Sequence, residues 1–304
     1  MDLQQLAYRF APIIRHATVF AHWPADCFSP LNWLGWDRVP ENPTFMRCLA
    51  VERENTTGDL SGLPPLVPVC YYSVVESQNY FFLFYNWYHP YDWKDVFPHD
   101  HDIESILLVV HKREGMIGLV TVFHLWMLTY VHPSKRRDPP DILSPEMVID
   151  SSGRFCVFME AQGHGITGRN MRILFSRPTM IFSPALKPPH ERARIVTPSA
   201  HLWNPSRTMM TCPYSLVNLF DPEHGIASHF GDPKVFQSDG KRRLTVACRR
   251  GGKYVPGKAH APGSHDGPFV DRMAGDPIAF CEGRLIVNDP PGQYLSNPWS
   301  GVTA

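Results

Sequence analysis

The stretch Asn79–Val110, NYFFLFYNWYHPYDWKDVFPHDHDIESILLVV, predicts two strands joined by an acidic, histidine-rich loop. Its first part, Tyr80–Tyr88, is an aromatic run without charge or glycine, and Ile103–Val110 is a second, largely apolar run. Flat rings and β-branched side chains fill the covered surface of a pleated sheet, so both runs are typical of buried strands. Acids and imidazoles crowd the connecting segment, at Asp92, Asp95, His99, Asp100, His101, Asp102 and Glu104.

The spacing of these groups indicates a cation site. Side chains alternate between the two faces of a strand, so Asp102 and Glu104 would share one face. His99 and Asp92 would close the site from the loop. Three oxygen ligands and one imidazole favour a single divalent cation, Mg²⁺, Mn²⁺ or Ca²⁺, and are compatible with Zn²⁺ or Fe²⁺. A solvated acidic turn without metal is the alternative, because short clusters of Asp and His also occur in surface loops.

The same residues carry a resemblance to a known family. The segment His99–Glu104, preceded by Pro98, resembles the Gly-His-Arg-His-Asp-Trp-Glu heptapeptide of the necrosis- and ethylene-inducing peptide-like proteins. Tyr85–Asp92 is similar to that family's Tyr-Ser-Trp-Tyr-Phe-Pro-Lys-Asp. The departures are Pro98 for Gly, Asp100 for Arg and Ile103 for Trp. The first two alter loop shape and local charge, and none removes a ligand.

In that family, an Asp after the aromatic strand and the His, Asp and Glu of the heptapeptide hold a divalent cation. The resemblance therefore implies a set of four metal ligands: Asp92, His99, Asp102 and Glu104. Two outer patches resemble the related vacuolar protein sorting-associated sandwich proteins. They are Leu6–Arg15, followed by His22–Asp26, and Gln162–Gly165.

Short apolar runs separated by turn residues predict a mainly β fold, an antiparallel β-sandwich with few short helices and long Pro/Gly-rich loops. The resemblance implies the same fold. The chain has 304 residues, of which 43% are apolar, 30 are proline and 21 are glycine. We expect a single β-sandwich domain over residues 1–304, in which residues 176–304 form an elaborated C-terminal extension without a counterpart in the compact family.

Charge, motifs and cysteines narrow the class of protein. The net charge of zero gives no electrostatic footprint for nucleic acid. The common nucleotide-binding, serine-hydrolase and zincin motifs are absent from the sequence. Seven cysteines, an odd number mostly within apolar runs, predict buried free thiols. No secretory signal and no transmembrane segment is apparent, so we expect a cytoplasmic protein, or a secreted one if the sequence is a trimmed mature chain.

Three histidines outside the ligand set are candidates for supporting roles. Glycines on either side of His164 let the backbone turn tightly, which predicts an open imidazole that serves as general base or extra ligand. A histidine that caps the turn fits the same pattern. His101, among the predicted ligands, is a second candidate for proton transfer. His124 lies in an apolar run, where a hydrogen-bonded core residue is the commoner role, although it could also support a ligand from behind.

Three classes of function remain. In a metal-dependent hydrolase or lyase, the cation would polarise a substrate oxygen or activate water, and His164 or His101 would move protons. In a recognition protein, the resemblance implies cation-mediated binding of a glycan or sphingolipid headgroup, with cytolytic activity. In the third class the cation is only structural. The lack of an export signal and of paired cysteines favours the enzyme, whose small-molecule, glycan or lipid-headgroup substrate the sequence does not identify.

The purified chain should hold about one divalent ion, because its donors match those of a single oxygen-rich site. Elemental analysis of the wild type and of Asp102→Ala checks this, and the variant should lose most of its metal. Equal and negligible metal in both proteins would contradict the cation site.

Overall fold

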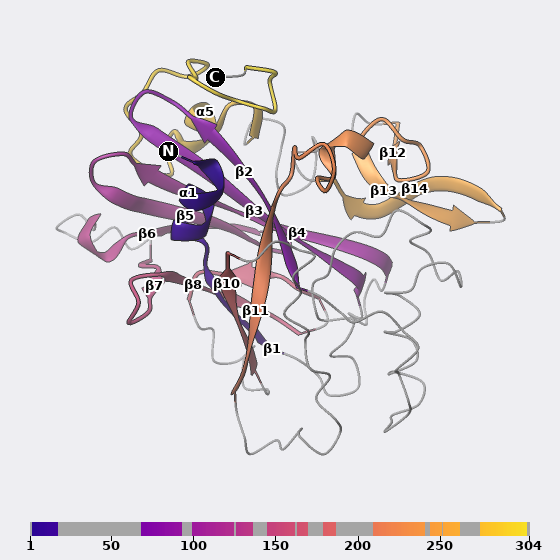
Figure 1. Cartoon of the computed structure of the whole chain (residues 1–304), viewed down its shortest axis with the longest axis horizontal. Helices are drawn as coiled ribbons and strands as arrows, with labels where there is room; N and C mark the ends of the chain where they lie inside the picture. Colours follow the sequence, from indigo (N-terminus) through magenta and orange to yellow (C-terminus); the bar gives the residue numbers. More distant parts are fainter. Residues whose placement is uncertain are drawn as a thin grey trace.

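The computed structural model describes residues 2–17, 68–92, 99–124, 126–135, 145–161, 163–169, 179–186, 209–240, 244–250, 252–261 and 274–302. Within them, eleven strands form one large, curled sheet, and three more form a small second sheet (Figure 1). The order across the large sheet is β6-β5-β4-β3-β2-β11-β10-β1-β8-β7, and β9 pairs with β8. The mainly β, sandwich-like fold expected from the sequence is confirmed.

The strands of the large sheet are β1 (Ile13–Ala17), β2 (Val69–Glu76), β3 (Tyr80–Asp92), β4 (His99–His111), β5 (Gly115–Phe123), β6 (Trp126–Val131), β7 (Val148–Ile149), β8 (Phe155–Met159), β9 (Ile166–Thr167), β10 (Thr179–Ala185) and β11 (Met209–Asn218). Those of the small sheet are β12 (Phe236–Ser238), β13 (Leu244–Arg250) and β14 (Lys253–His260). The helices are α1 (Leu3–Phe10), α5 (Pro277–Cys281) and the 3₁₀ turns η1 (Pro133–Lys135) and η2 (Ala227–His229).

Strands β3 and β4 are the two strands predicted from the opening stretch, and both are longer than predicted. They pair antiparallel from Tyr80 opposite His111 to Asp92 opposite His99. Leu83, Tyr85 and Trp87 face one hydrophobic cluster, whereas Phe82 and Phe84 face another. Both faces of β3 are therefore covered, which explains why its sequence is continuously apolar and does not alternate.

The large sheet is mixed, although the sequence predicted antiparallel strands. Strands β2 to β6 form an antiparallel meander, but β1 pairs with β8, β10 with β11, and β11 with β2 in parallel. Parallel neighbours need crossover connections of a dozen or more residues, and 23 residues, numbered 186–208, separate β10 from its parallel neighbour β11. Strands β10 and β11, from the predicted C-terminal extension, lie inside the sheet. The single-domain organisation stays a prediction.

The α-helices α1 and α5 are short. Among the described residues, no helix is long and apolar enough to cross a membrane. Asp2 caps the N-terminus of helix α1, and its side chain accepts a hydrogen bond from the Gln4 amide. It ends at Phe10, as the following Ala11-Pro12 predicts. Arg154 then donates to the backbone carbonyls of Tyr8, Arg9 and Ala11, which satisfies acceptors at the helix end.

Four cysteines with described side chains, Cys70, Cys156, Cys248 and Cys281, are buried thiols outside any disulfide. The prediction of buried thiols is confirmed for these four. Burial raises the pKa of the Cys281 thiol to about 12, so this group stays protonated at neutral pH. The side chains of Cys27, Cys48 and Cys212 lie outside the described part of the chain.

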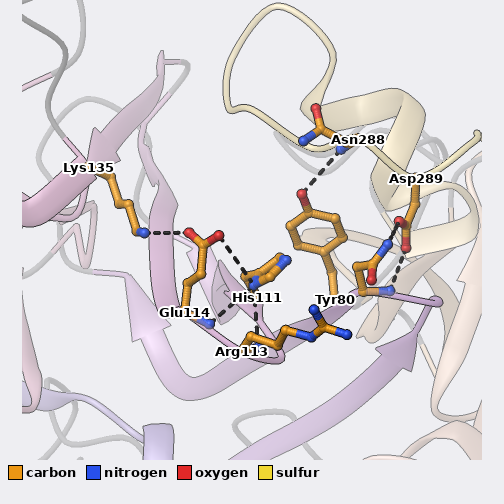
Figure 2. A network of polar contacts seen from close by, with 8 residues as sticks. Tyr80, His111, Arg113, Glu114, Lys135, Asn288 and Asp289 are labelled. Atoms are coloured by element: carbon orange, nitrogen blue, oxygen red, sulfur yellow. Dashed lines mark hydrogen bonds and ion pairs between the residues drawn. The ribbon is translucent and has the colours of Figure 1, made fainter.

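The C-terminal segment, residues 274–302, is hydrogen-bonded to the hairpin that joins β2 to β3 (Figure 2). The Asp289 carboxylate, only 6% exposed, accepts hydrogen bonds from the backbone amide and the side-chain amide of Asn79, at 2.8 and 2.6 Å. The backbone amide of Asn288 donates to the Tyr80 hydroxyl at 3.2 Å. Burial raises the pKa of Asp289, but hydrogen bonds from Ser77 and Asn79 outweigh burial and lower it overall.

Replacing Asp289 by alanine should lower the free energy of unfolding by about 2 kcal/mol at pH 7, the usual worth of hydrogen bonds to a charged group. A carboxyl whose pKa is lowered by folding stabilises the fold above its unfolded pKa, near 3.9, and this contribution disappears as pH falls through the folded pKa. The deficit of Asp289→Ala should therefore shrink below about pH 4. Urea unfolding at several pH values measures it.

Glu223→Ala is the matched control, because the Glu223 side chain is 83% exposed. It should change the free energy of unfolding by less than about 0.5 kcal/mol. An Asp289→Ala deficit that is absent at pH 7, or that grows as pH falls, would show that the carboxylate does not fasten the C-terminal segment.

Candidate functional site

The four predicted metal ligands lie where β3 ends and β4 begins. Asp92 and His99 face each other across the last pair of the ladder, with 3.7 Å between Asp92 Oδ2 and His99 Nδ1. Asp102 lies opposite His89, and Glu104 lies opposite Trp87. Asp92, His99 and Glu104 are half-buried and Asp102 is 9% exposed. Residues 93–98 of the predicted loop are outside the described residues.

An irregular backbone separates these two pairs. In a regular strand, His99 and Asp102 would point to opposite faces, because three positions separate them. His101, however, has a φ of 65°, in the left-handed region that L-residues rarely adopt. This conformation interrupts the alternation between His99 and Asp102, and so gives the donors on either side of His101 a way to approach one another.

His164 is buried, so the expectation of an open imidazole is wrong. Its ring is 0% exposed, and its Nδ1 lies 2.8 Å from Asp102 Oδ2. A carboxylate only accepts hydrogen bonds, so Nδ1 carries the proton. The ring stacks on His89 with centroids 3.8 Å apart and planes 8° from parallel, and both rings lie near His16. We call Asp102, His16, His89 and His164 the histidine cluster.

His101 points to the other face of β4. Its Nδ1 lies 2.9 Å from the Tyr88 hydroxyl, and its ring is also 0% exposed. Tyr88 belongs to the hydrophobic cluster that includes Val246 and Ala261 beside the small sheet. The two residues predicted to move protons, His101 and His164, therefore lie on opposite faces of one strand, and the structure does not bring them together.

A second pair of imidazole and carboxylate lies beside the histidine cluster. His124 Nε2 is 2.6 Å from Glu160 Oε1, and the His124 ring meets Phe123 edge-on. A Cβ added at Gly165 would lie 3.0 Å from the Phe123 ring and 3.4 Å from Glu160 Oε1, so this turn fits closely against the pair. Sequence reasoning missed Glu160, although a lone acid at the end of an apolar strand was a signal for it.

Backbone strain gathers at this end of the sheet. The non-glycine residues with positive φ among the described positions are His101, His124 and His164, with φ of 65°, 54° and 52°. Such conformations cost about 1–3 kcal/mol each and persist where the surrounding structure holds them, which is common at functional sites. The strain therefore marks the same region as the predicted ligands.

The chemistry of the predicted donors fits a divalent cation, but the described side chains do not form a complete metal site. Among the residues that the structure describes, no group of three or more His, Cys, Asp or Glu side chains is placed to hold a metal ion. One oxygen of Asp102 is already hydrogen-bonded to His164. The cation and its four ligands stay a prediction.

No family model matches the sequence, and no curated protein matches it. Its neighbours among solved structures are necrosis- and ethylene-inducing proteins. The non-toxic HaNLP3 protein is 17% identical, with a TM-score of 0.34, and the match covers 56% of this chain and 70% of that chain. Necrosis and Ethylene inducing Protein 2, from the causal agent of cocoa's witches' broom disease, is 15% identical, with a TM-score of 0.33 and coverages of 54% and 67%.

These neighbours belong to the family that the heptapeptide resembles. The relationship is distant, and at such identities the likeness concerns the fold alone.

Substitutions at His164 should reverse the usual order of glycine and alanine. Glycine adopts a left-handed backbone without strain, whereas alanine does not, so His164→Gly should be more stable than His164→Ala by about 1 kcal/mol. His16, in β1, is the control: there glycine should be less stable than alanine by about 0.5–1 kcal/mol. Thermal unfolding of the four variants measures both differences. The same order at both positions would show that the φ of His164 is not strained.

Proposed function

We propose that this chain is a carbohydrate-binding protein that holds an amino sugar at the end of the sheet marked by the histidine cluster. The observation that carries the proposal is an exposed indole on the same hairpin as an imidazole–carboxylate pair. Trp126 is 70% exposed and pairs with Phe123, on the hairpin that places His124 against Glu160. Asp92 and Glu104, half-buried at the ends of β3 and β4, supply further carboxylates.

This combination suits a sugar chemically. The hydroxyl groups and the ammonium group of an amino sugar donate hydrogen bonds, and carboxylates accept them, most strongly from a charged donor. The C–H face of a pyranose ring packs against an indole, which has a large apolar surface and a polar edge. The Trp126 side chain is 70% exposed, so a sugar ring packed against it would remove apolar surface from water.

The predicted divalent cation would offer a second route to the sugar, through its hydroxyl groups. Held by Asp92, His99, Asp102 and Glu104, it would supply a positive charge to which sugar hydroxyl oxygens coordinate. The carboxylates can also bind the ammonium group of the sugar without any cation. Binding in the presence and absence of a chelator therefore separates the two routes.

Burial of the proton-transfer candidates favours binding over catalysis. A general acid or base must come within hydrogen-bond reach of its substrate, directly or through one water molecule. His101 and His164 are both 0% exposed, and they lie on opposite faces of β4. They cannot act together on one substrate in this arrangement.

A metal-dependent hydrolase or lyase is the second candidate, and one contact favours it. The Asp102 carboxylate fixes the tautomer of His164 as the carboxylate of a catalytic triad fixes that of its histidine. Release of nitrophenol from a nitrophenyl glucosaminide by the wild type, reduced about 10²–10⁴-fold by His164→Ala, would favour this candidate.

Isothermal titration with glucosamine tests the binding function. One solved neighbour, NLPPya, was crystallised in complex with glucosamine and another of its crystals holds mannosamine, so both sugars are practical probes. Glu104→Gln and Trp126→Ala should each weaken binding about tenfold, because each removes roughly 1.4 kcal/mol of contact. EDTA should weaken it further if the cation takes part.

Glu223→Gln is the control for charge, because it removes the same charge from a side chain that is 83% exposed and lies outside the site. It should bind glucosamine as the wild type does. Failure of the wild type to bind either amino sugar, with or without added Ca²⁺ or Mg²⁺, would refute the proposal, as would equal weakening by Glu223→Gln.

A further inference from the structure

A hollow lies at the other end of β4 from the histidine cluster. It has a volume of about 750 Å³, and α1, the β4–β5 turn, the end of β6 and the β7–β8 turn line it together. Pockets that bind small molecules have volumes of about 300–1,000 Å³, so this cavity is large enough for one.

One part of the cavity wall is aromatic and apolar. Tyr8 and Phe10 contribute from α1, Met116 from β5 and Phe155 from β8. Tyr8, Phe10 and Met116 are half-buried and keep part of their apolar surface available. A flat ring in the cavity would cover this surface.

The cavity also holds two guanidinium groups. Among the described residues no acid forms an ion pair with Arg9, whose guanidinium carbon lies 5.3 Å from the centre of the Phe10 ring. Arg154 donates to the carbonyls at the end of α1 through Nη1 alone, at 2.6–3.1 Å, and its other nitrogens carry further donors. Two permanent positive charges therefore border the cavity.

The negative charge of the acid that lines the cavity, Glu114, is balanced by a lysine. Glu114 pairs with Lys135, and Figure 2 shows these two side chains facing each other while Arg113 points away. The hydrogen bond and charge of Lys135 lower the pKa of Glu114, so the carboxylate stays ionised. Burial, followed by the charge of Lys135, lowers the pKa of His132, so this imidazole is neutral at pH 7. The remaining charge in the cavity is positive.

We infer that this cavity is a second binding site, which takes a small aromatic carboxylate. The ring packs against Tyr8, Phe10 and Met116, and the carboxylate accepts hydrogen bonds from Arg9, with Arg154 adding positive charge. Arginine suits this role because its planar fork matches the two oxygens of a carboxylate. The site is separate from the proposed sugar site in both place and charge, since the sugar site is lined by acids.

The test uses 2-naphthoate as the probe and its neutral amide, 2-naphthamide, as the ligand control. The wild type should bind 2-naphthoate more tightly than the amide in a fluorescence titration. Arg9→Gln should weaken naphthoate about tenfold and leave the amide nearly unchanged, because only the carboxylate needs the charge. Gln5→Trp, which fills the cavity from an exposed position of α1, should weaken both ligands.

Arg113→Gln is the matched protein control: it removes the same charge from the β4–β5 turn, but Arg113 does not line the cavity. It should bind both ligands like the wild type. Equal binding of naphthoate and amide by the wild type would overturn the inference. So would equal weakening by Arg9→Gln and Arg113→Gln, or unchanged binding by Gln5→Trp, in variants that keep the melting temperature and glucosamine binding of the wild type.

Discussion

The pairing of β3 with β4, with both faces of β3 covered, is the constraint on which the rest of the structure depends. Every side chain of β3 from Phe82 to Tyr88 is buried, and the apolar ones belong to one of the three hydrophobic clusters. A slip of one residue would move every side chain to the other face. Such a slip would move Asp102 away from His164 and turn the acids of β4 toward the opposite face of the sheet. Packing of the aromatic rings therefore fixes the geometry of the site.

The polar interior at the end of this ladder is unusual for a sandwich core. His16, His89 and His164 are each 0% exposed, and they gather beside Asp102. Burial of such groups is tolerated where hydrogen bonds compensate for lost hydration. The left-handed backbone at His101, His124 and His164 adds strain that the surrounding packing has to hold. The geometry of this end of the sheet therefore depends on the packing around it.

The two ends of β4 differ in charge, which the net charge of zero conceals. Carboxylates of Asp92, Asp102 and Glu104 lie at its beginning, whereas Arg9 and Arg154 border the cavity beyond its end. One strand thus links a region suited to hydrogen-bond donors and cations with a region suited to an anion. Neither region depends on the other for its charge, because the strand and its covered faces keep them apart.

The sequence by itself determined the two central strands, the end of α1 before Pro12 and the four buried thiols that the structure describes, because local composition and backbone preferences decide such features. It also brought Asp92 and His99 to one strand end. Only the tertiary structure decided that His164 turns inward to Asp102, 62 residues away, that Glu160 meets His124, and that four distant segments enclose a cavity. These contacts depend on the order of the strands, on the parallel crossovers and on histidines with a left-handed backbone. The alternation of apolar and polar residues along a strand encodes none of these features.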